Sequence, residues 1–272
     1  MYPYEIVFGL TLYEICLCAG IIACFAVFSA FADKLRINVK VQKLAVMCGV
    51  CAVILGYGSA VLFQAFYNIK TLGEFVINES TGATFYGGLI GGVAVFMLLY
   101  FPLGRLIFKS GEHVRAFFDV ANSAVCGIAL AHAIGRLGCL FAGCCHGHQT
   151  DAWYGIEMYG NAGFASYVPT QLFESVFLLF LFAFLTLRVW GRDGYGLPVY
   201  LIAYGVWRFA IEHLRGDYRG DTLVEWLTPS QLTAVCMVAI GVGVIFIERA
   251  AVKHFERIEA KAVTQAEADD EK

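Results

Sequence analysis

Residues 115–142 read RAFFDVANSAVCGIALAHAIGRLGCLFA, and this run decides the fold class of the chain. A membrane-spanning helix needs about 20 mostly apolar residues, and this run is longer than that. It nevertheless carries Arg136 close to its end. A charge inside the hydrocarbon region costs several kcal/mol, so such a residue usually faces a polar cavity and marks function. A second arginine, Arg208, is embedded in the same way in YGVWRFAIE, residues 204–212.

The composition also indicates an integral membrane protein. The 272-residue chain is 59% hydrophobic and 15% charged, whereas a soluble domain is about 45–50% apolar and about 25% charged. Its mean hydropathy is +0.69. The net charge of −3 comes without a basic stripe or patch, so we expect no nucleic-acid partner. Met1–Glu5 lacks the basic start of a cleavable signal peptide, and we expect the first apolar run to be retained as a helix.

Seven apolar runs have the length of spanning helices. We therefore predict an all-α integral membrane protein with seven transmembrane helices, in which residues 1–250 form the membrane domain. Residues 251–272 form a charged cytoplasmic tail, which we expect to be a fraying helix or disordered. The fourth run has glycines near its end, where we expect a turn that lines a cavity. The seven runs cover about residues 8–31, 43–67, 84–103, 115–142, 170–188, 196–214 and 230–249.

The distribution of basic residues predicts the orientation of these helices. The connections after the first, third and fifth runs are rich in Lys and Arg, and so is the tail. The connections after the second, fourth and sixth runs are poor in them or offset by acids. The positive-inside rule then places the N-terminus outside and the C-terminus in the cytoplasm. In this orientation Arg208 lies near the midplane, and polar residues from separate stretches of the chain share the outer half of the membrane: Tyr86, Arg136, Gln171, Glu174, Glu212 and Arg215.

The embedded arginines suggest recognition of an anionic group. A guanidinium stays charged and offers forked donors that suit phosphate or carboxylate. Glu212 follows Arg208 by four residues, so we expect the two to pair on one helix face. Arg136 has no acid three or four residues away, which favours a ligand-binding role. Arg215 equally suits a residue that snorkels to the outer interface, and the glycines of 87–92 equally suit helix packing or close approach to a ligand.

Seven of the ten cysteines lie in apolar runs, in which a thiol packs as a small hydrophobe, whereas the other three cluster beside Arg136. They lie in CLFAGCCHGH, which begins at Cys139, continues through Cys144 and Cys145 and ends at His148. Together with His146 and His148 they are potential zinc ligands, although the spacing is not a paired Cys-x-x-Cys set. A disulfide from Cys139 and a thiolate nucleophile beside the arginine are further options. We favour a fourth interpretation, in which the small thiols pack a tight turn.

Five segments, in order along the chain, resemble the prolipoprotein diacylglyceryl transferase family. FYGGLIG at 85–91 resembles FHGGLIG of the family, and GRLGCLFAGCCHG at 135–147 resembles its signature GRIGNFINGExxG. PTQLFE at 169–174 resembles PxQLYE, and residues 204–215 resemble YGxxRxxxExxR. LTPSQL at 227–232 resembles the closing LSxGQx.

The resemblance implies a reaction at a bacterial cell membrane, with the active site toward the outer leaflet. A diacylglyceryl group would pass from phosphatidylglycerol to the lipobox cysteine thiol of a prolipoprotein, next to its signal peptide, with release of glycerol phosphate. Arg136 and Arg208 would bind the phosphate and stabilise charge on the leaving group, and Tyr86 would be the third catalytic residue. The resemblance implies no metal and no cofactor. The substrate-binding residues that it implies are Gly87, Gly88, Cys139, Gly147, Gln171, Glu174, Tyr204, Glu212 and Arg215.

Three of the departures from the family pattern matter most for the chemistry. Tyr86 stands where the family has His, Cys139 where it has Asn, and Cys144 where it has Glu. A phenol is a poorer base than an imidazole at neutral pH. Other functions therefore stay open: a paralogue that transfers a phospholipid-derived group to a different acceptor, a binding or transport protein for an anionic lipid or solute, and a redox- or metal-linked membrane protein centred on the three cysteines.

Overall fold

The computed structural model divides the chain into two compact units. One unit is Met1–Leu35 together with Ala121–Lys272, and the other is Arg36–Val120. The structure describes residues 5–7, 9–73, 75, 77–78, 81–160, 163–216 and 226–270.

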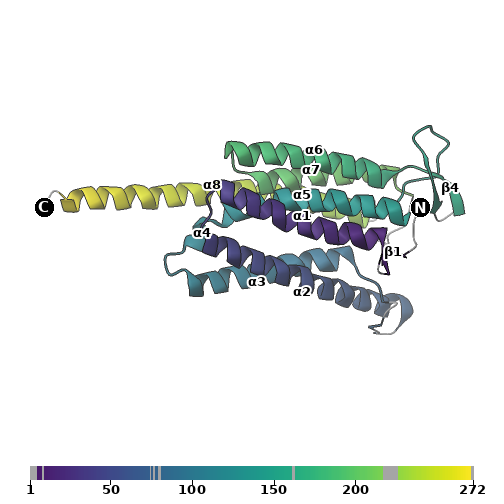
Figure 1. The fold of residues 1–272 in the computed structure, drawn as a ribbon, viewed down its shortest axis with the longest axis horizontal. Coiled ribbons are helices and arrows are strands. Elements are labelled where there is room, and N and C mark those ends of the chain that lie inside the picture. Colours follow the sequence, from purple (N-terminus) through teal and green to yellow (C-terminus); the bar gives the residue numbers. More distant parts are fainter. Residues whose placement is uncertain are drawn as a thin grey trace. The chain divides into compact units, whose positions relative to one another are not determined.

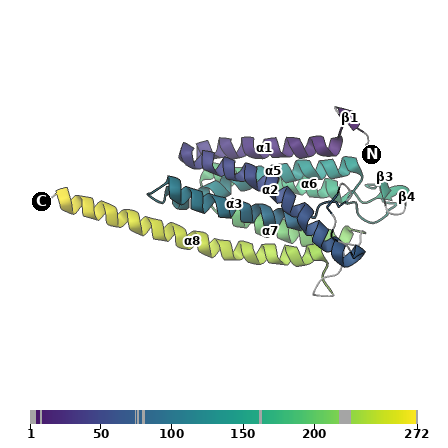
Figure 2. The same ribbon diagram turned by 90° about the horizontal axis from the view of Figure 1, so that it is seen from below.

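The first unit is a set of long helices with two small hairpins at its connections (Figure 1). Its helix α7 packs against both α6 and α8, as two perpendicular views show (Figure 2). The hairpins are antiparallel, β1 with β2 and β3 with β4. The elements are β1 (Glu5–Val7), β2 (Leu10–Thr11), α1 (Leu12–Lys34), α5 (Phe117–Ala142), β3 (Ile156–Gly160), β4 (Gly163–Tyr167), α6 (Thr170–Gly191), α7 (Gly196–Ile211), the 3-10 helix η1 (Glu212–Leu214) and α8 (Pro229–Asp270).

The first unit has an apolar outer surface and buries polar groups inside. Large apolar side chains such as Ile22 and Phe180 are 70% and 73% exposed. Gln171 and Glu174, by contrast, are fully buried. Many exposed apolar side chains indicate contact with a membrane or a partner, and polar residues of spanning helices face the interior of the bundle. The buried core consists of Phe31, Val125, Cys126, Ala129, Ala133, Leu178, Leu181, Leu185, Val189, Tyr200 and Tyr204.

The second unit is a helical hairpin, α2 (Val39–Leu72) with α3 (Phe85–Ile107), followed by the short helix α4 (Glu112–Arg115). The first residues of α5, up to Val120, also belong to it. Its two long helices pack closely because α3 begins with glycines. A Cβ added to Gly87 would lie 2.6 Å from Cβ of Phe63, and Oγ of Ser59 donates a hydrogen bond of 2.9 Å to the Gly87 carbonyl. The structure therefore shows the packing role that the glycine run suggested.

Six helices of the described chain are long and apolar enough to cross a membrane, namely α1, α2, α3, α5, α6 and α8. The remaining predicted span corresponds to α7, which has 16 residues. The prediction of a mostly helical membrane protein is thus confirmed, whereas the seventh span and the orientation stay predictions. The two hairpins differ from the all-α prediction, which included no strands.

The observed helix ends differ from the predicted ones for local reasons. Helix α1 begins after residue 8 because Thr11 caps it: the Glu14 carboxylate accepts from the Thr11 amide at 2.7 Å, and Thr11 accepts from the Glu14 amide. Helix α5 continues past its glycines, and the expected turn comes after its end, at Gly143, where φ is +70°. Helix α8 continues to Asp270, so a helix is the correct one of the two forms predicted for the tail.

Candidate functional site

Arg136 on α5 is anchored by a carboxylate from the neighbouring helix α6. Its Nε lies 3.0 Å from Oε2 of Glu174. Oε1 of the same carboxylate accepts a hydrogen bond of 2.6 Å from the hydroxyl of Tyr204 on α7. A buried charge persists where it is paired and hydrogen-bonded. The structure therefore brings together three predicted site residues from three helices, and the partner that Arg136 lacks on its own helix comes from α6.

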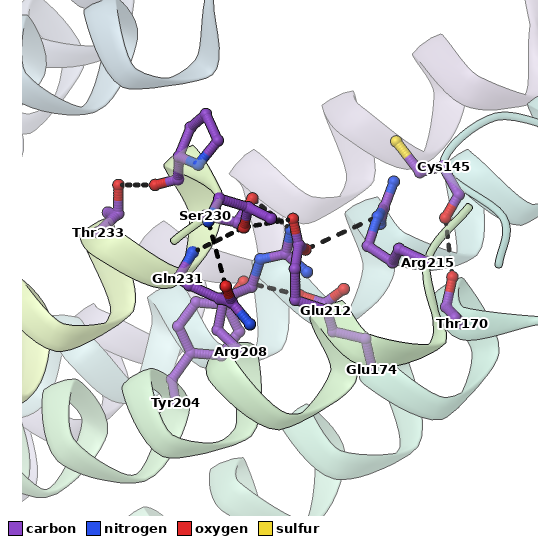
Figure 3. Close-up of polar contacts among 12 residues, drawn as sticks. Cys145, Thr170, Glu174, Tyr204, Arg208, Glu212, Arg215, Ser230, Gln231 and Thr233 are labelled. Atoms are coloured by element: carbon purple, nitrogen blue, oxygen red, sulfur yellow. Dashed lines mark hydrogen bonds and ion pairs between the residues drawn. The ribbon is translucent and has the colours of Figure 1, made fainter. Parts of the chain in front are cut away.

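Arg208 forms the ion pair with Glu212 that the sequence predicted. Its Nη2 lies 2.7 Å from Oε2 of Glu212 and donates a hydrogen bond of 2.8 Å to Oγ of Ser230, at the start of α8 (Figure 3). The other terminal nitrogen, Nη1, is buried and has no hydrogen-bond partner among the described residues. A buried guanidinium nitrogen without a partner costs free energy, so this atom is suited to receive an anionic ligand.

Arg215 is buried, so the interpretation of it as a snorkelling residue is wrong. Its side chain is 2% exposed, and its Nε lies 3.9 Å from Oε2 of Glu212. Glu212 therefore lies between two guanidinium groups, and it also accepts a hydrogen bond of 3.0 Å from Oγ1 of Thr228. These contacts hold Arg208 and Arg215 in fixed positions beside one carboxylate (Figure 3).

Buried guanidinium groups are concentrated in the described part of this unit. Those of Arg136, Arg208 and Arg215 lie beside two carboxylates, from Glu174 and Glu212. A buried cation is stabilised by negatively charged partners. A phosphodiester is an anion of the kind that these groups could bind.

His132 belongs to this network, and the sequence analysis did not identify it. Its Nδ1 lies 3.2 Å from the hydroxyl of Tyr200, and its Nε2 lies 3.4 Å from the hydroxyl of Tyr204 and 4.0 Å from Oε1 of Glu174. The signal was present in the sequence: His132 precedes Arg136 by four residues, so the two share a helix face. His132 is thus a second side chain of α5, besides Arg136, that lies close to the Glu174 carboxylate.

Gln171 holds the cysteine-rich turn that follows α5. Its Nε2 donates a hydrogen bond of 2.6 Å to the carbonyl of Cys144, and Oγ1 of Thr170 donates one of 2.8 Å to the carbonyl of Cys145. The first turn of α6 therefore fixes the backbone after Gly143. Cys139 contributes its side chain to the same turn, because the sulfur atoms of Cys139, Cys144 and Cys145 all lie within 4.8 Å of one another.

The two cysteines beyond α5 have different electrostatic surroundings. The pKa of the Cys145 thiol is lowered by hydrogen bonds from the thiols of Cys139 and Cys144, with a further contribution from the guanidinium groups of Arg215 and Arg136. The pKa of the Cys144 thiol is raised, chiefly by its hydrogen bonds with Cys139 and Cys145. Negative charge in the turn is therefore most stable on Cys145, whose side chain lies beside Arg215 (Figure 3).

Gly147 lets two backbone segments approach each other. Its amide donates a hydrogen bond of 2.8 Å to the carbonyl of Val168, and it pairs with Arg215 in an isolated β-bridge. A Cβ at this position would meet the carbonyl of Leu214 and lie 2.8 Å from Cβ of Val168. The glycine thus positions the segment that carries Arg215.

The remaining predicted residues lie in the second unit. Tyr86, Gly87 and Gly88 form part of the first turn of α3, where Tyr86 is partly buried. The contacts of Gly87 and Gly88 are with α2. A catalytic role for Tyr86 and a substrate-binding role for the two glycines stay predictions.

The sequence of the chain is similar to those of known prolipoprotein diacylglyceryl transferases. The family model described as prolipoprotein diacylglyceryl transferase matches residues 4–247. A phosphatidylglycerol–prolipoprotein diacylglyceryl transferase of Clostridium tetani is 32% identical over 251 residues, which cover 89% of this chain and 95% of the relative. Enzymes with the same name from Clostridium perfringens and Dehalococcoides mccartyi are 34% and 29% identical, over 59% and 70% of this chain and 60% and 73% of their own lengths.

Proposed function

The chain belongs to the prolipoprotein diacylglyceryl transferase family, and we propose that it transfers the diacylglyceryl group of phosphatidylglycerol to the lipobox cysteine thiol of a prolipoprotein. The products are a thioether-linked diacylglyceryl protein and glycerol phosphate. The substrates are the ones that the names of the relatives contain. The lipobox and its signal peptide are part of the proposal.

The observation that carries this proposal is the pair of arginines anchored by buried carboxylates. Glu174 orients Arg136, and Glu212 with Ser230 orients Arg208. The concentration of buried guanidinium groups suits the negatively charged phosphodiester of the lipid. Since these groups are held in place before any substrate binds, they require little reorganisation during the reaction.

The chemistry follows from the charge that develops on the leaving group. As the thiol sulfur forms its bond to the glyceryl carbon, the bond between that carbon and the phosphate oxygen breaks, and its electron pair moves onto the phosphate. The leaving glycerol phosphate therefore gains negative charge in the transition state. We propose that Arg136 and Arg208 stabilise this charge, and that Tyr86, in its phenolate form, accepts the thiol proton and becomes the neutral phenol.

We further propose that the protein lies in the bacterial cell membrane with seven spans. The N-terminus would be outside and residues 251–272 in the cytoplasm, because basic residues alternate between connections in the way that the positive-inside rule requires. Residues 1–250 would form the membrane domain. In this orientation Arg136 lies in the outer half and Arg208 near the midplane, so the site opens toward the outer leaflet, where a lipid headgroup and a cysteine just beyond a signal helix can meet.

A direct assay of transfer tests the proposal. The purified chain is incubated in phospholipid micelles with phosphatidylglycerol labelled in its diacylglycerol part and with a lipobox peptide that contains one cysteine. We expect thioether-linked label on the peptide. Consumption of the lipid without labelled peptide would indicate another acceptor. Intact lipid and peptide, beside an active relative as control, would contradict the enzyme assignment and favour binding or transport.

A further inference from the structure

Three sulfur atoms converge on one point after the end of α5. Cys139 lies in the last turn of that helix, and the chain then reverses at Gly143 so that Cys144 and Cys145 return to its side. The amide of Cys144 donates a hydrogen bond of 3.1 Å to the carbonyl of Cys139, which closes the turn. As a result, all three Sγ atoms lie within 4.8 Å of one another.

The backbone of this turn is fixed from outside and carries a residue in an unusual conformation. The hydrogen bonds from Thr170 and Gln171 hold the carbonyls of Cys145 and Cys144. Cys145 has a φ of +64°, in the left-handed region that residues other than glycine seldom adopt. Such a conformation persists where the surroundings determine it, and it is common at functional sites. In this turn, the residue with the left-handed conformation is the one whose sulfur lies close to those of Cys139 and Cys144.

We propose that Cys139, Cys144 and Cys145 bind one thiophilic metal ion, of the Zn(II) or Cu(I) type. Sulfur donors select these soft ions over Mg²⁺ or Ca²⁺. Metal–sulfur bonds of about 2.3 Å place three thiolates about 3.7–4.0 Å apart around one ion, so the observed spacing closes onto an ion with small side-chain rotations. A disulfide would use two of the three sulfurs and leave the third without a function.

The charges around the turn favour this ion. Three thiolates carry one more negative charge than Zn(II) neutralises, and two more than Cu(I) does. The guanidinium group of Arg215 lies beside Cys145 (Figure 3), so it offsets part of the remaining charge. Cys144 is exposed, which gives an ion a route to the site.

The neighbouring histidines do not complete the set of ligands in this conformation. Nδ1 of His146 lies 2.9 Å from the carbonyl of Gly147, and its ring packs against Tyr167. His148 is exposed. Among the described residues, the group able to hold an ion consists of the three cysteines. Three ligands suit Cu(I) directly, and Zn(II) would take a fourth ligand from solvent or substrate.

A metal titration of the full chain tests this site without reference to transferase activity. The protein is purified in detergent, kept reduced with a phosphine under nitrogen, stripped with a chelator and titrated with Cd(II), which reports on Zn(II)-type sites by its sulfur-to-metal absorption. A parallel titration uses Cu(I) against a coloured Cu(I) chelator. We expect about one ion per chain in at least one arm, and the arm that saturates at the lower concentration identifies the preferred ion.

Matched cysteine variants locate the binding. Cys144→Ser changes an exposed residue and is expected to fold, and it should weaken binding by more than about 100-fold, because loss of outer-shell partners alone costs about 10- to 100-fold. Cys236→Ser, which changes an exposed cysteine of α8, should bind as the parent does. The proposal is overturned if the reduced parent binds neither ion, if Cys144→Ser binds as tightly as the parent, or if Cys236→Ser loses binding to the same extent.

Discussion

Glu174→Gln is the substitution that separates a positioned arginine from one that is merely present. The amide has nearly the same volume as the carboxylate and can still accept the hydrogen bond from Tyr204. It removes the negative charge that lies 3.0 Å from Nε of Arg136 and places an NH2 donor where the acceptor oxygen was. Because Glu174 is fully buried, solvent cannot replace that charge. The variant would therefore still contain Arg136, but its guanidinium group would lose the carboxylate that orients it.

The expected size of the effect follows from the geometry. At 3.0 Å and an effective dielectric constant of about 20, the attraction between the two charges is about 5–6 kcal/mol. Measured losses on breaking buried pairs are about 3–5 kcal/mol, because one charge remains buried without its partner. We expect a loss of stability in this range. We also expect transfer to fall by at least about 100-fold in the folded protein, since misplacing a catalytic group by 1 Å costs about that much.

Two measurements on the same preparation check this prediction. Thermal unfolding in detergent gives the stability, and the rate of label transfer to a lipobox peptide, normalised to folded protein, gives the activity. Glu157→Gln, in the exposed part of β3, is the matched control and should change neither quantity. If folded Glu174→Gln protein transferred label within about two-fold of the parent rate, the reasoning that Glu174 positions Arg136 would be wrong.

Three further substitutions test separate parts of the structure. Tyr204→Phe removes the donor to Glu174 and should cost about 1.5–3 kcal/mol in thermal unfolding; an unchanged melting temperature would contradict the hydrogen bond of 2.6 Å. Gly147→Ala places a methyl group against Leu214 and should cost about 1–3 kcal/mol and lower activity; a stability equal to that of the parent would refute the close approach. Tyr86→Phe should reduce transfer by about 10²–10⁴-fold. Tyr86→His should retain or raise the rate at neutral pH, because imidazole is the stronger base there. Equal rates for both variants would exclude Tyr86 as the proton acceptor.

The helices could be predicted from the sequence because their signal is long and redundant. A run of about 20 apolar residues has few other structures available to it. The ends were less predictable, since they depend on single contacts such as the capping box of Thr11 and Glu14. The length of α8 was underestimated because the hydropathy of the chain falls at about residue 250, whereas its helical backbone continues to Asp270. The short strands β3 and β4 lie in a polar connection and gave no periodic signal that was recognised.

The site could be predicted where a residue's partner is close in sequence. The pair of Arg208 and Glu212 follows from their spacing of four. The pairing of Arg136 with Glu174 crosses between two helices, so no local rule contains it. Gln171 was expected to bind substrate, but the contact observed for it is with the backbone carbonyl of Cys144, and a backbone partner leaves no mark in the sequence.

The central claim is that Arg136 and Arg208 together stabilise a phosphate leaving group. The most direct measurement is the rate of diacylglyceryl transfer from labelled phosphatidylglycerol to a lipobox peptide by Arg136→Ala and by Arg208→Ala, each compared with Arg257→Ala, an exposed position on α8. We predict that the first two variants remain folded and lose transfer by at least about 10²–10³-fold, the cost of removing one preorganised donor, while Arg257→Ala transfers at the parent rate. Transfer retained by both folded Arg136→Ala and Arg208→Ala would contradict the account.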